Sequence, residues 1–140
     1  MSIVYLALGS NMGDRLYYIH KAIEEIKASG IKVVKISSIV ETDPQDAPVQ
    51  DKFLNAVLKA QTLHSPEDLI FLLQGIERKL GRKNKMFRGP RVIDIDILLY
   101  DDIKLVASSL LIPHPRMLER PFVMKPLEEI DPLLCASLKI

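Results

Sequence analysis

Apolar residues in the first forty positions follow two different periods. Residues 3–8 form a mostly apolar run with the length of a buried strand, and the turn-forming residues 9–14 end it. Asp14 is a suitable N-cap for a helix that ends near Gly30. The apolar residues of this helix recur at helical spacing: Leu16, Ile19, Ala22, Ile23 and Ile26. Residues 31–40 are rich in Ile and Val and predict a second strand.

The following sixty residues contain the same kinds of segment. Residues 54–62 are apolar at alternate positions, which predicts a strand with one face in the core. Ser65 and Pro66 are a favourable N-cap and first residue for a second helix, which ends at Gly81. The buried stripe of this helix consists of Leu69, Leu72, Leu73, Ile76 and Leu80. Residues 92–100 alternate again and predict a fourth strand.

The predicted order is therefore strand, helix, strand, strand, helix, strand. It indicates an α+β fold with a ferredoxin-like βαββαβ core, in which both helices pack on one face of an antiparallel sheet. Prolines, including Pro121 and Pro126, recur in the last forty residues and predict an irregular C-terminal extension of short helical turns and loops. We expect residues 1–140 to form a single domain.

Composition narrows the class of protein without indicating an activity. Hydrophobic residues make up 48% and charged residues 26%, which excludes wholesale disorder. The formal charge of +1 gives no global reason to expect a nucleic acid or an anionic membrane as partner. Cys135 is the only cysteine, so neither an internal disulfide nor a cysteine metal cluster can form. With no signal peptide or membrane span in the pattern, we expect a cytoplasmic monomer.

Asp94 and Asp96 are the strongest candidates for chemistry. Residues two apart on a strand point to the same side, with Cα atoms about 6.6 Å apart. Two carboxylates held in this way can bind one or two Mg²⁺ ions, which clamp a phosphoryl group during in-line displacement. The alternative is an amphipathic strand with an acidic face in solvent.

A basic segment precedes this acidic pair. Residues 78–91 contain seven Lys or Arg residues and no Asp or Glu: Arg78, Lys79, Arg82, Lys83, Lys85, Arg88 and Arg91. Cationic side chains beside a divalent-metal site would suit a polyphosphate substrate. The alternatives are a solvated loop or an RNA-backbone contact. An RNA-binding sheet needs stacking aromatics, and Tyr5 is the one candidate on the strands 3–8 and 93–96.

Three further features have both a functional and a structural interpretation. Phe53 and Asn55 share one strand face, where a ring and a carboxamide could bind a flat heterocycle, although Phe53 could also cap the core. His114 lies between prolines in a stiff loop and, with Arg120, could reach phosphates, although a lone loop histidine is more often structural. The glycine-containing segment 9–13 lacks the spacing of a P-loop and is interpreted as a turn and helix cap.

Taken together, these segments resemble the 6-hydroxymethyl-7,8-dihydropterin pyrophosphokinase family. The matches span residues 6 to about 132 in order: Leu8-Gly9-Ser10-Asn11, Gly13-Asp14, Thr42, Pro44, Phe53-Leu54-Asn55-Ala56, Ile76-Glu77, Leu80-Gly81-Arg82, Gly89-Pro90-Arg91, Asp94-Ile95-Asp96-Ile97-Leu98 and Ile112-Pro113-His114. The Gly-Pro-Arg segment followed by Asp-x-Asp is the most specific of them. Arg88, preceded by Phe87, stands where the family commonly has an aromatic, and Leu111 stands where a polar ATP contact is often found.

The resemblance implies an enzyme of folate biosynthesis that transfers diphosphate from ATP to 6-hydroxymethyl-7,8-dihydropterin and releases AMP. It implies two Mg²⁺ ions on Asp94 and Asp96, and catalytic roles for Arg82, Arg91 and Asp96. The ATP site would consist of Gln74, Glu77, Arg82, Arg91, Ile97, His114 and Arg120. The pterin site would consist of Thr42, Phe53, Asn55, Asp94 and Phe122. The competing hypotheses are an RNA-binding ferredoxin-like module and an inactive homologue that binds nucleotide.

Overall fold

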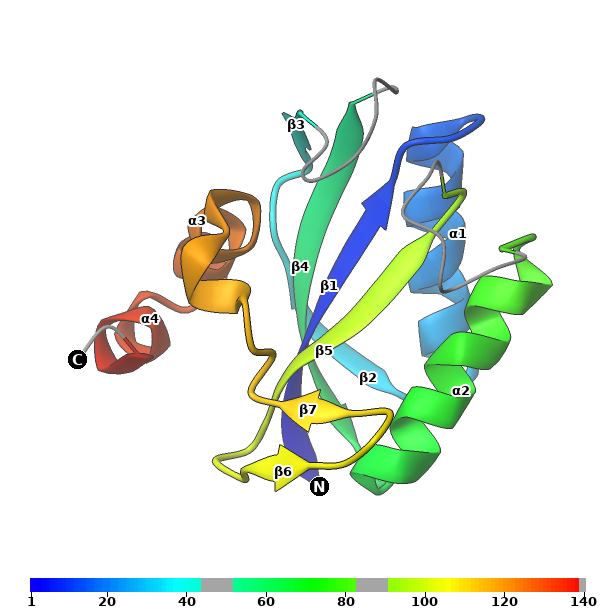
Figure 1. Ribbon diagram of the computed structural model, residues 1–140. Helices are drawn as coiled ribbons and strands as arrows, with labels where there is room; N and C mark the ends of the chain where they lie inside the picture. Colours follow the sequence, from blue (N-terminus) through cyan, green and yellow to red (C-terminus); the bar gives the residue numbers. More distant parts are fainter. Residues whose placement is uncertain (44–51, 83–90, 139–140) are drawn as a thin grey trace.

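A computed structural model describes residues 1–43, 52–82 and 91–138, which form a sheet with helices on both faces (Figure 1). The main sheet contains β1 (Ser2–Ser10), β2 (Lys32–Ile36), β3 (Val40–Thr42), β4 (Phe53–Thr62) and β5 (Asp94–Tyr100). Its helices are α1 (Arg15–Ala28), α2 (Pro66–Lys79), α3 (Pro121–Ile130) and α4 (Pro132–Leu138). A hairpin of β6 (Leu105–Val106) and β7 (Leu111–Ile112), and the short 3₁₀ helix η1 (Met117–Glu119), connect β5 to α3.

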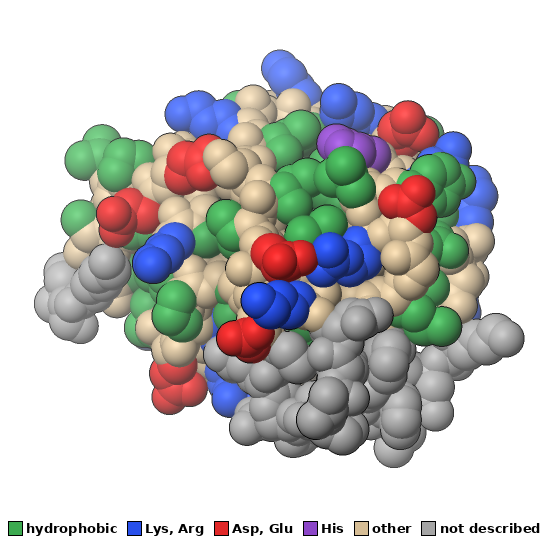
Figure 2. All heavy atoms as spheres, turned by 90° about the horizontal axis from the view of Figure 1, so that it is seen from above, with side chains coloured by type: hydrophobic (Ala, Val, Ile, Leu, Met, Phe, Trp, Pro, Cys, Tyr) green, Lys and Arg blue, Asp and Glu red, His purple; other side chains and the backbone are tan. Residues whose placement is uncertain are grey.

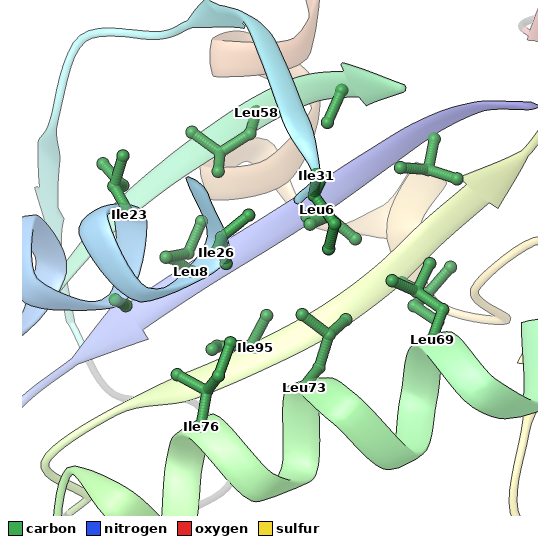
Figure 3. Close-up of a cluster of buried hydrophobic side chains, with 14 of the residues drawn as sticks. Leu6, Leu8, Ile23, Ile26, Ile31, Leu58, Leu69, Leu73, Ile76 and Ile95 are labelled. Carbon is green, nitrogen blue, oxygen red and sulfur yellow. The ribbon is translucent and has the colours of Figure 1, made fainter. Parts of the chain in front are cut away.

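The sheet is antiparallel and has the order β2-β4-β1-β5, with β3 also paired to β4. Helices α1 and α2 cover one face, and their apolar stripes pack against that face (Figure 3). The buried cluster includes Leu6, Leu58 and Ile95 from the sheet and Ile26 and Leu73 from the helices. The predicted mixture of helices with an antiparallel sheet is confirmed, as is the packing of both long helices on one face.

The predicted helix caps are also confirmed. Asp14 accepts a hydrogen bond of 3.1 Å from the backbone N–H of Tyr17, and Ser65 accepts one of 3.2 Å from that of Asp68. Gly81 has a φ of +111°, a left-handed conformation that favours glycine and ends the path of α2. Local sequence therefore determines where both long helices begin and where α2 leads into Arg82.

The predicted strand 31–40 is wrong in its extent, because it is divided into β2 and β3. The division falls at Ser37, whose hydroxyl accepts from the backbone N–H of Val57 at 2.8 Å while its own N–H donates to Val57 O at 2.9 Å. Beyond this contact the chain leaves the edge of β4 and pairs again at Val40, opposite Asn55. This second pairing brings Thr42 opposite Phe53.

The C-terminal extension is more regular than the prediction of short helical turns and loops, because most of it forms η1, α3 and α4. Pro121 and Pro132 are the first residues of α3 and α4, where a missing backbone N–H costs nothing, and Pro126 lies within α3. The two helices cover the sheet face opposite α1 and α2 (Figure 1). Their buried partners include Tyr5, Val57 and Leu98. The molecule consequently has a core on each side of the sheet.

A register shift between β1 and β5 distributes the residues of β5 between these two cores. Ile95 and Ile97 lie in the core beneath α1 and α2, whereas Leu98 and Leu99 both lie in the core beneath α3. The shift occurs where Leu6 pairs with Ile97 and Tyr5 with Leu99, leaving an extra residue in β5. Asp94 and Asp96 precede the shift and share the face opposite Ile95 and Ile97, as the alternation predicted.

Asp131, between α3 and α4, ties this second layer to the sheet. Its carboxylate accepts from the hydroxyl of Tyr5 on β1 and, at 3.2 Å, from the backbone N–H of Leu134. Lys59 on β4 lies 3.6 Å from the same carboxylate. The hydrogen bond from Tyr5, followed by those contacts, lowers the pKa of Asp131 below its ordinary value. The ionised carboxylate therefore stabilises the docking of α3 and α4.

We predict that Asp131→Ala lowers the free energy of unfolding at pH 7 by about 2 kcal/mol, because the Tyr5 hydroxyl loses its partner in the packed layer. Urea denaturation measures this change. In a Tyr5→Phe background the same substitution should cost clearly less, since the hydrogen bond is already absent. The wild-type advantage should also fade as the pH falls from the ordinary pKa of 3.8 toward the lower pKa of the folded carboxyl, because only the unfolded chain takes up the proton in that range. Equal losses in both backgrounds would contradict this account.

Candidate active site

A cavity of about 230 Å³ lies on the α3 side of the sheet, beside the end of β1 and the start of β5. Its lining combines phenylalanine rings with an amide, carboxylates, a histidine and arginines. Seen from this end of the molecule, acidic, basic and histidine side chains gather close to apolar ones (Figure 2). The cavity therefore has the apolar wall and the few polar groups typical of a small-molecule site.

Gly9 forms part of the lining between two functional strands. It pairs with Asn55 of β4 on one side and with Asp94 of β5 on the other. A Cβ at this position would lie 3.4 Å from Asn55 Oδ1 and 3.5 Å from Phe53 Cδ1. The absence of a side chain thus leaves space next to the amide and the ring.

One part of the cavity is suited to a flat polar ring. Asn55 is buried and donates a 2.7 Å hydrogen bond through Nδ2 to Thr42 Oγ1, which fixes the orientation of its amide. Phe53 and Phe122 both line the cavity, and the guanidinium of Arg120 lies 5.5 Å from the centre of the Phe122 ring. The predicted group Thr42, Phe53, Asn55 and Phe122 is therefore brought together by β3, β4 and α3.

Carboxylates and arginines form the opposite part. Asp94 and Asp96 both line the cavity, and so does Arg91, whose Nη1 lies 3.6 Å from Asp94 Oδ2. Among the residues that the structure describes, no three His, Cys, Asp or Glu side chains are grouped closely enough to hold a metal ion. A cation at the two aspartates would need further ligands from a substrate or from water, which is how proteins commonly bind Mg²⁺.

Two of the predicted site residues lie beneath the cavity and not in its wall. Glu77 and Arg82 are only 1% and 8% exposed. Arg82 Nη1 donates to Glu77 Oε2 at 3.0 Å and to Asp94 Oδ1, while the backbone N–H of Ile95 donates to Glu77 Oε2 at 2.7 Å. Burial alone lowers the pKa of Arg82, but the carboxylates of Asp94 and Glu77 outweigh it and raise the pKa. Arg82 is therefore a permanent cation that orients Asp94 from below.

His114 lies at the rim shared by two hollows. Burial, and then the charge of Arg120, lower its pKa from the ordinary 6.5, against a weaker opposite effect of Asp94. Its Nδ1 accepts from the backbone N–H of Arg116 at 3.2 Å, and its own backbone N–H donates to Leu98 O at 2.9 Å. A neutral ring held in this way carries its proton on Nε2.

The second hollow, of about 340 Å³, adjoins the first and shares Asp96 and His114 with it. The other lining residues come from α2, β5, the β6–β7 hairpin and the segment after it: Ile70, Gln74, Ile97, Ala107, Ser108, Ser109, Leu110, Leu111 and Pro115. Gln74 and Ile97, two of the predicted ATP contacts, are therefore separated from the phenylalanine rings by Asp96 and His114. Leu111, which stands where the family often has a polar ATP contact, lines the same hollow as Gln74 and Ile97.

Asn11 is a residue whose importance the sequence interpretation missed. Residues 9–14 were interpreted as a turn and a cap, which is right for Asp14. Asn11, however, is buried and forms hydrogen bonds with the backbone of Arg91, which lies 80 positions later in the sequence. Its place in the Leu8-Gly9-Ser10-Asn11 segment was the only signal. The basic residues Lys83, Lys85 and Arg88, together with Phe87, lie outside the described residues.

Comparison with known proteins identifies the family. The model of the 7,8-dihydro-6-hydroxymethylpterin-pyrophosphokinase (HPPK) family matches residues 5–132. The chain is 45% identical over 132 residues to the 2-amino-4-hydroxy-6-hydroxymethyldihydropteridine pyrophosphokinase of Aquifex aeolicus, covering 94% of this chain and 82% of that protein. It is 50% identical over 128 residues to the folic acid synthesis protein fol1 of Pneumocystis carinii, covering 91% of this chain but only 17% of that longer protein.

A crystal structure of an HPPK-DHPS in complex with substrates has the same fold, with a TM-score of 0.71 at 15% identity. The superposition covers 94% of this chain and 40% of that one. The resemblance inferred from the motifs is confirmed by the family match over nearly the whole chain. The chain belongs to the 7,8-dihydro-6-hydroxymethylpterin-pyrophosphokinase family.

Proposed function

We propose that this chain transfers diphosphate from ATP to the hydroxymethyl group of 6-hydroxymethyl-7,8-dihydropterin, giving AMP and the dihydropterin diphosphate for folate biosynthesis. The observation that carries the proposal is the pair of adjoining hollows that share Asp96 and His114. The first hollow offers rings and an amide and also contains Asp94 and Arg91, whereas the second contains Gln74 and Ile97. Asp96 and His114 line both. Two substrates bound side by side would meet at these charged groups.

The pterin would occupy the hollow beside Gly9. Phe53 and Phe122 offer ring faces for stacking, and the amide of Asn55, oriented by Thr42, offers hydrogen bonds to the edge of a heterocycle. Asp94 borders the same space. This arrangement would direct the hydroxymethyl group toward the two aspartates.

Asp94 and Asp96 would hold two Mg²⁺ ions together with phosphate oxygens of ATP. Their carboxylates are hard oxygen ligands on one strand face, so the residues present fit this ion. Bound there, Mg²⁺ would neutralise phosphate charge and orient the diphosphoryl group. The chain's own share is to hold the carboxylates in place: Arg82 donates to Asp94 from below, and Arg91 lies on its other side.

The remaining contacts to ATP would come from side chains that line the two hollows. Arg91 and Arg120 line the cavity and would bind phosphate oxygens, while His114 would donate from Nε2 without adding charge. Gln74 and Ile97 would contact the nucleotide in the second hollow. Glu77 and Arg82 would support ATP binding through Asp94. Rate acceleration would come from positioning and electrostatics.

We further propose that the core is a variant of the ferredoxin-like βαββαβ fold in a single domain of residues 1–140. The order β2-β4-β1-β5, with α1 and α2 on one face, supports this, and β3 is an addition to it.

In the parts of the chain that the structure describes, none of the helices has the length and apolar character that a membrane span requires. A cytoplasmic monomer without a nucleic-acid partner remains the proposal.

The function is tested by incubating the chain with Mg-ATP and 6-hydroxymethyl-7,8-dihydropterin and measuring AMP. We expect AMP to form in amounts equal to the pterin diphosphate, and neither substrate alone to yield it. Nucleotide binding without AMP would instead indicate an inactive homologue. Binding of RNA in a salt-sensitive manner, with no AMP, would contradict the proposal and favour the RNA-binding module.

Asp96→Asn should lower kcat by about 100-fold or more, because the amide cannot neutralise or ligate a cation as the carboxylate does. It should also abolish the Mg²⁺ dependence of ATP binding measured by calorimetry, while the thermal unfolding curve stays close to that of the wild type. Asp102→Asn, a matched change at an exposed aspartate after β5, should leave all three unchanged. Wild-type turnover in Asp96→Asn would refute the role of this carboxylate.

Without Mg²⁺ and nucleotide, His114 should titrate below 6.5 in a histidine NMR experiment. Arg120→Ala should raise its pKa, since that cation disfavours the imidazolium, whereas Lys125→Ala on the exposed side of α3 should not. Because the unfolded chain takes up the proton more readily, His114 also makes the protein less stable as the pH falls below 6.5. If the His114 pKa in Arg120→Ala equals that in the wild type, the charge of Arg120 is not the cause of the shift.

A further inference from the structure

Asn11 and Arg91 are joined by a reciprocal pair of hydrogen bonds across 80 positions of sequence. The backbone N–H of Asn11 donates to Arg91 O at 3.0 Å, and the backbone N–H of Arg91 donates to Asn11 Oδ1 at 2.7 Å. Asn11 directly follows β1, and Arg91 precedes β5 by three residues. The pair therefore connects the two strands just beyond the point where their regular pairing ends at Gly9 and Asp94.

The amide oxygen of Asn11 takes the place of a backbone carbonyl. In a continuing ladder a main-chain oxygen of β1 would accept from β5, but the chain after Asn11 turns toward the cap at Asp14. Asn11 is 1% exposed, whereas its neighbour Met12 is 48% exposed. A buried polar side chain needs hydrogen-bonding partners, and an apolar residue here would leave the N–H of Arg91 without this acceptor. The contact is thus specific to a short side chain that carries an oxygen.

The position of Arg91 matters because its side chain lines the cavity beside Asp94. Its Nη1 lies 3.6 Å from Asp94 Oδ2, and the residue lines the cavity together with both aspartates. Arg91 lies outside any helix or strand. The bonds from Asn11 fix its backbone relative to β1, and Gly9, two residues earlier on β1, lines the same cavity. Gly9, the two aspartates and Arg91 are consequently held relative to one another by the hydrogen bonds between β1 and the segment that leads into β5.

We propose that Asn11 is a positioning residue, which sets the backbone of Arg91 so that its guanidinium is aimed at the transferred diphosphoryl group. The inference rests on the proposed function, in which Arg91 stabilises that group. Asn11 itself does not line either hollow. Its contribution should appear in kcat more than in the affinity for pterin, because a small misplacement of a charged group weakens transition-state stabilisation most.

A double-mutant cycle separates this role from a purely structural one. Asn11→Ala should lower kcat by about 10-fold or more and change the KM for the pterin by less than about 3-fold. In an Arg91→Ala background, which is itself slow, the same substitution should cost less than about 2-fold, since there is no guanidinium left to aim. Met12→Ala, at the exposed neighbouring position, is the control and should match the wild type. Equal losses from Asn11→Ala in both backgrounds would overturn the proposal.

Amide hydrogen exchange gives a readout that does not depend on activity. The N–H of Arg91 should exchange faster by at least about 10-fold in Asn11→Ala, and should stay protected in Asn11→Asp, which keeps the accepting oxygen. Unchanged exchange in Asn11→Ala would also overturn the proposal. If the wild type forms no AMP, the proposed function fails instead, and exchange still decides whether Asn11 holds Arg91.

Discussion

The buried guanidinium of Arg82 is the contact on which the rest of the site depends. It joins Glu77 near the end of α2 to Asp94 at the start of β5, and Glu77 also accepts from the backbone of Ile95. Removing such charges from water costs several kcal/mol each, which only close pairing can offset. Helix, strand and arginine must therefore assemble together, and the direction of the Asp94 carboxylate is determined as they do so.

The division of the sheet into two faces explains why the cavity lies where it does. Near the middle of the sheet, the face opposite α1 and α2 is apolar, and α3 and α4 cover it. Toward the end of β1 the same face carries Gly9, Asn55 and Asp94, and the cavity opens beside them. Plain alternation puts Asp94, Asp96 and Leu98 on this face, and the register shift in β5 adds Leu99 to the second core. α3 then adds Phe122 from the side.

Periodicity in the sequence predicted β1, β4 and β5, both long helices and the shared face of Asp94 and Asp96, because each depends on near neighbours in the chain. It could not predict contacts that depend on tertiary structure. Glu77 is a charged residue beside the apolar stripe of α2, and nothing local indicates that Arg82 will bury it. Likewise, prolines suggest interruption, although Pro121 begins a helix whose apolar face is satisfied only by the distant strands. Asn11 looks like a turn residue until Arg91 is brought beside it.

The charges around the cavity are arranged so that they change little near neutral pH. Two carboxylates raise the pKa of Arg82, whereas burial and the adjacent Arg120 lower the pKa of His114 below 6.5. A histidine that gained a proton here would add a charge whose presence varied with pH, at the rim shared by both hollows. With a neutral imidazole, the positive charge comes from guanidinium groups, and its amount is constant. In the proposed reaction, guanidinium groups such as those of Arg91 and Arg120 would therefore neutralise phosphate, and His114 would serve as a neutral hydrogen-bond donor.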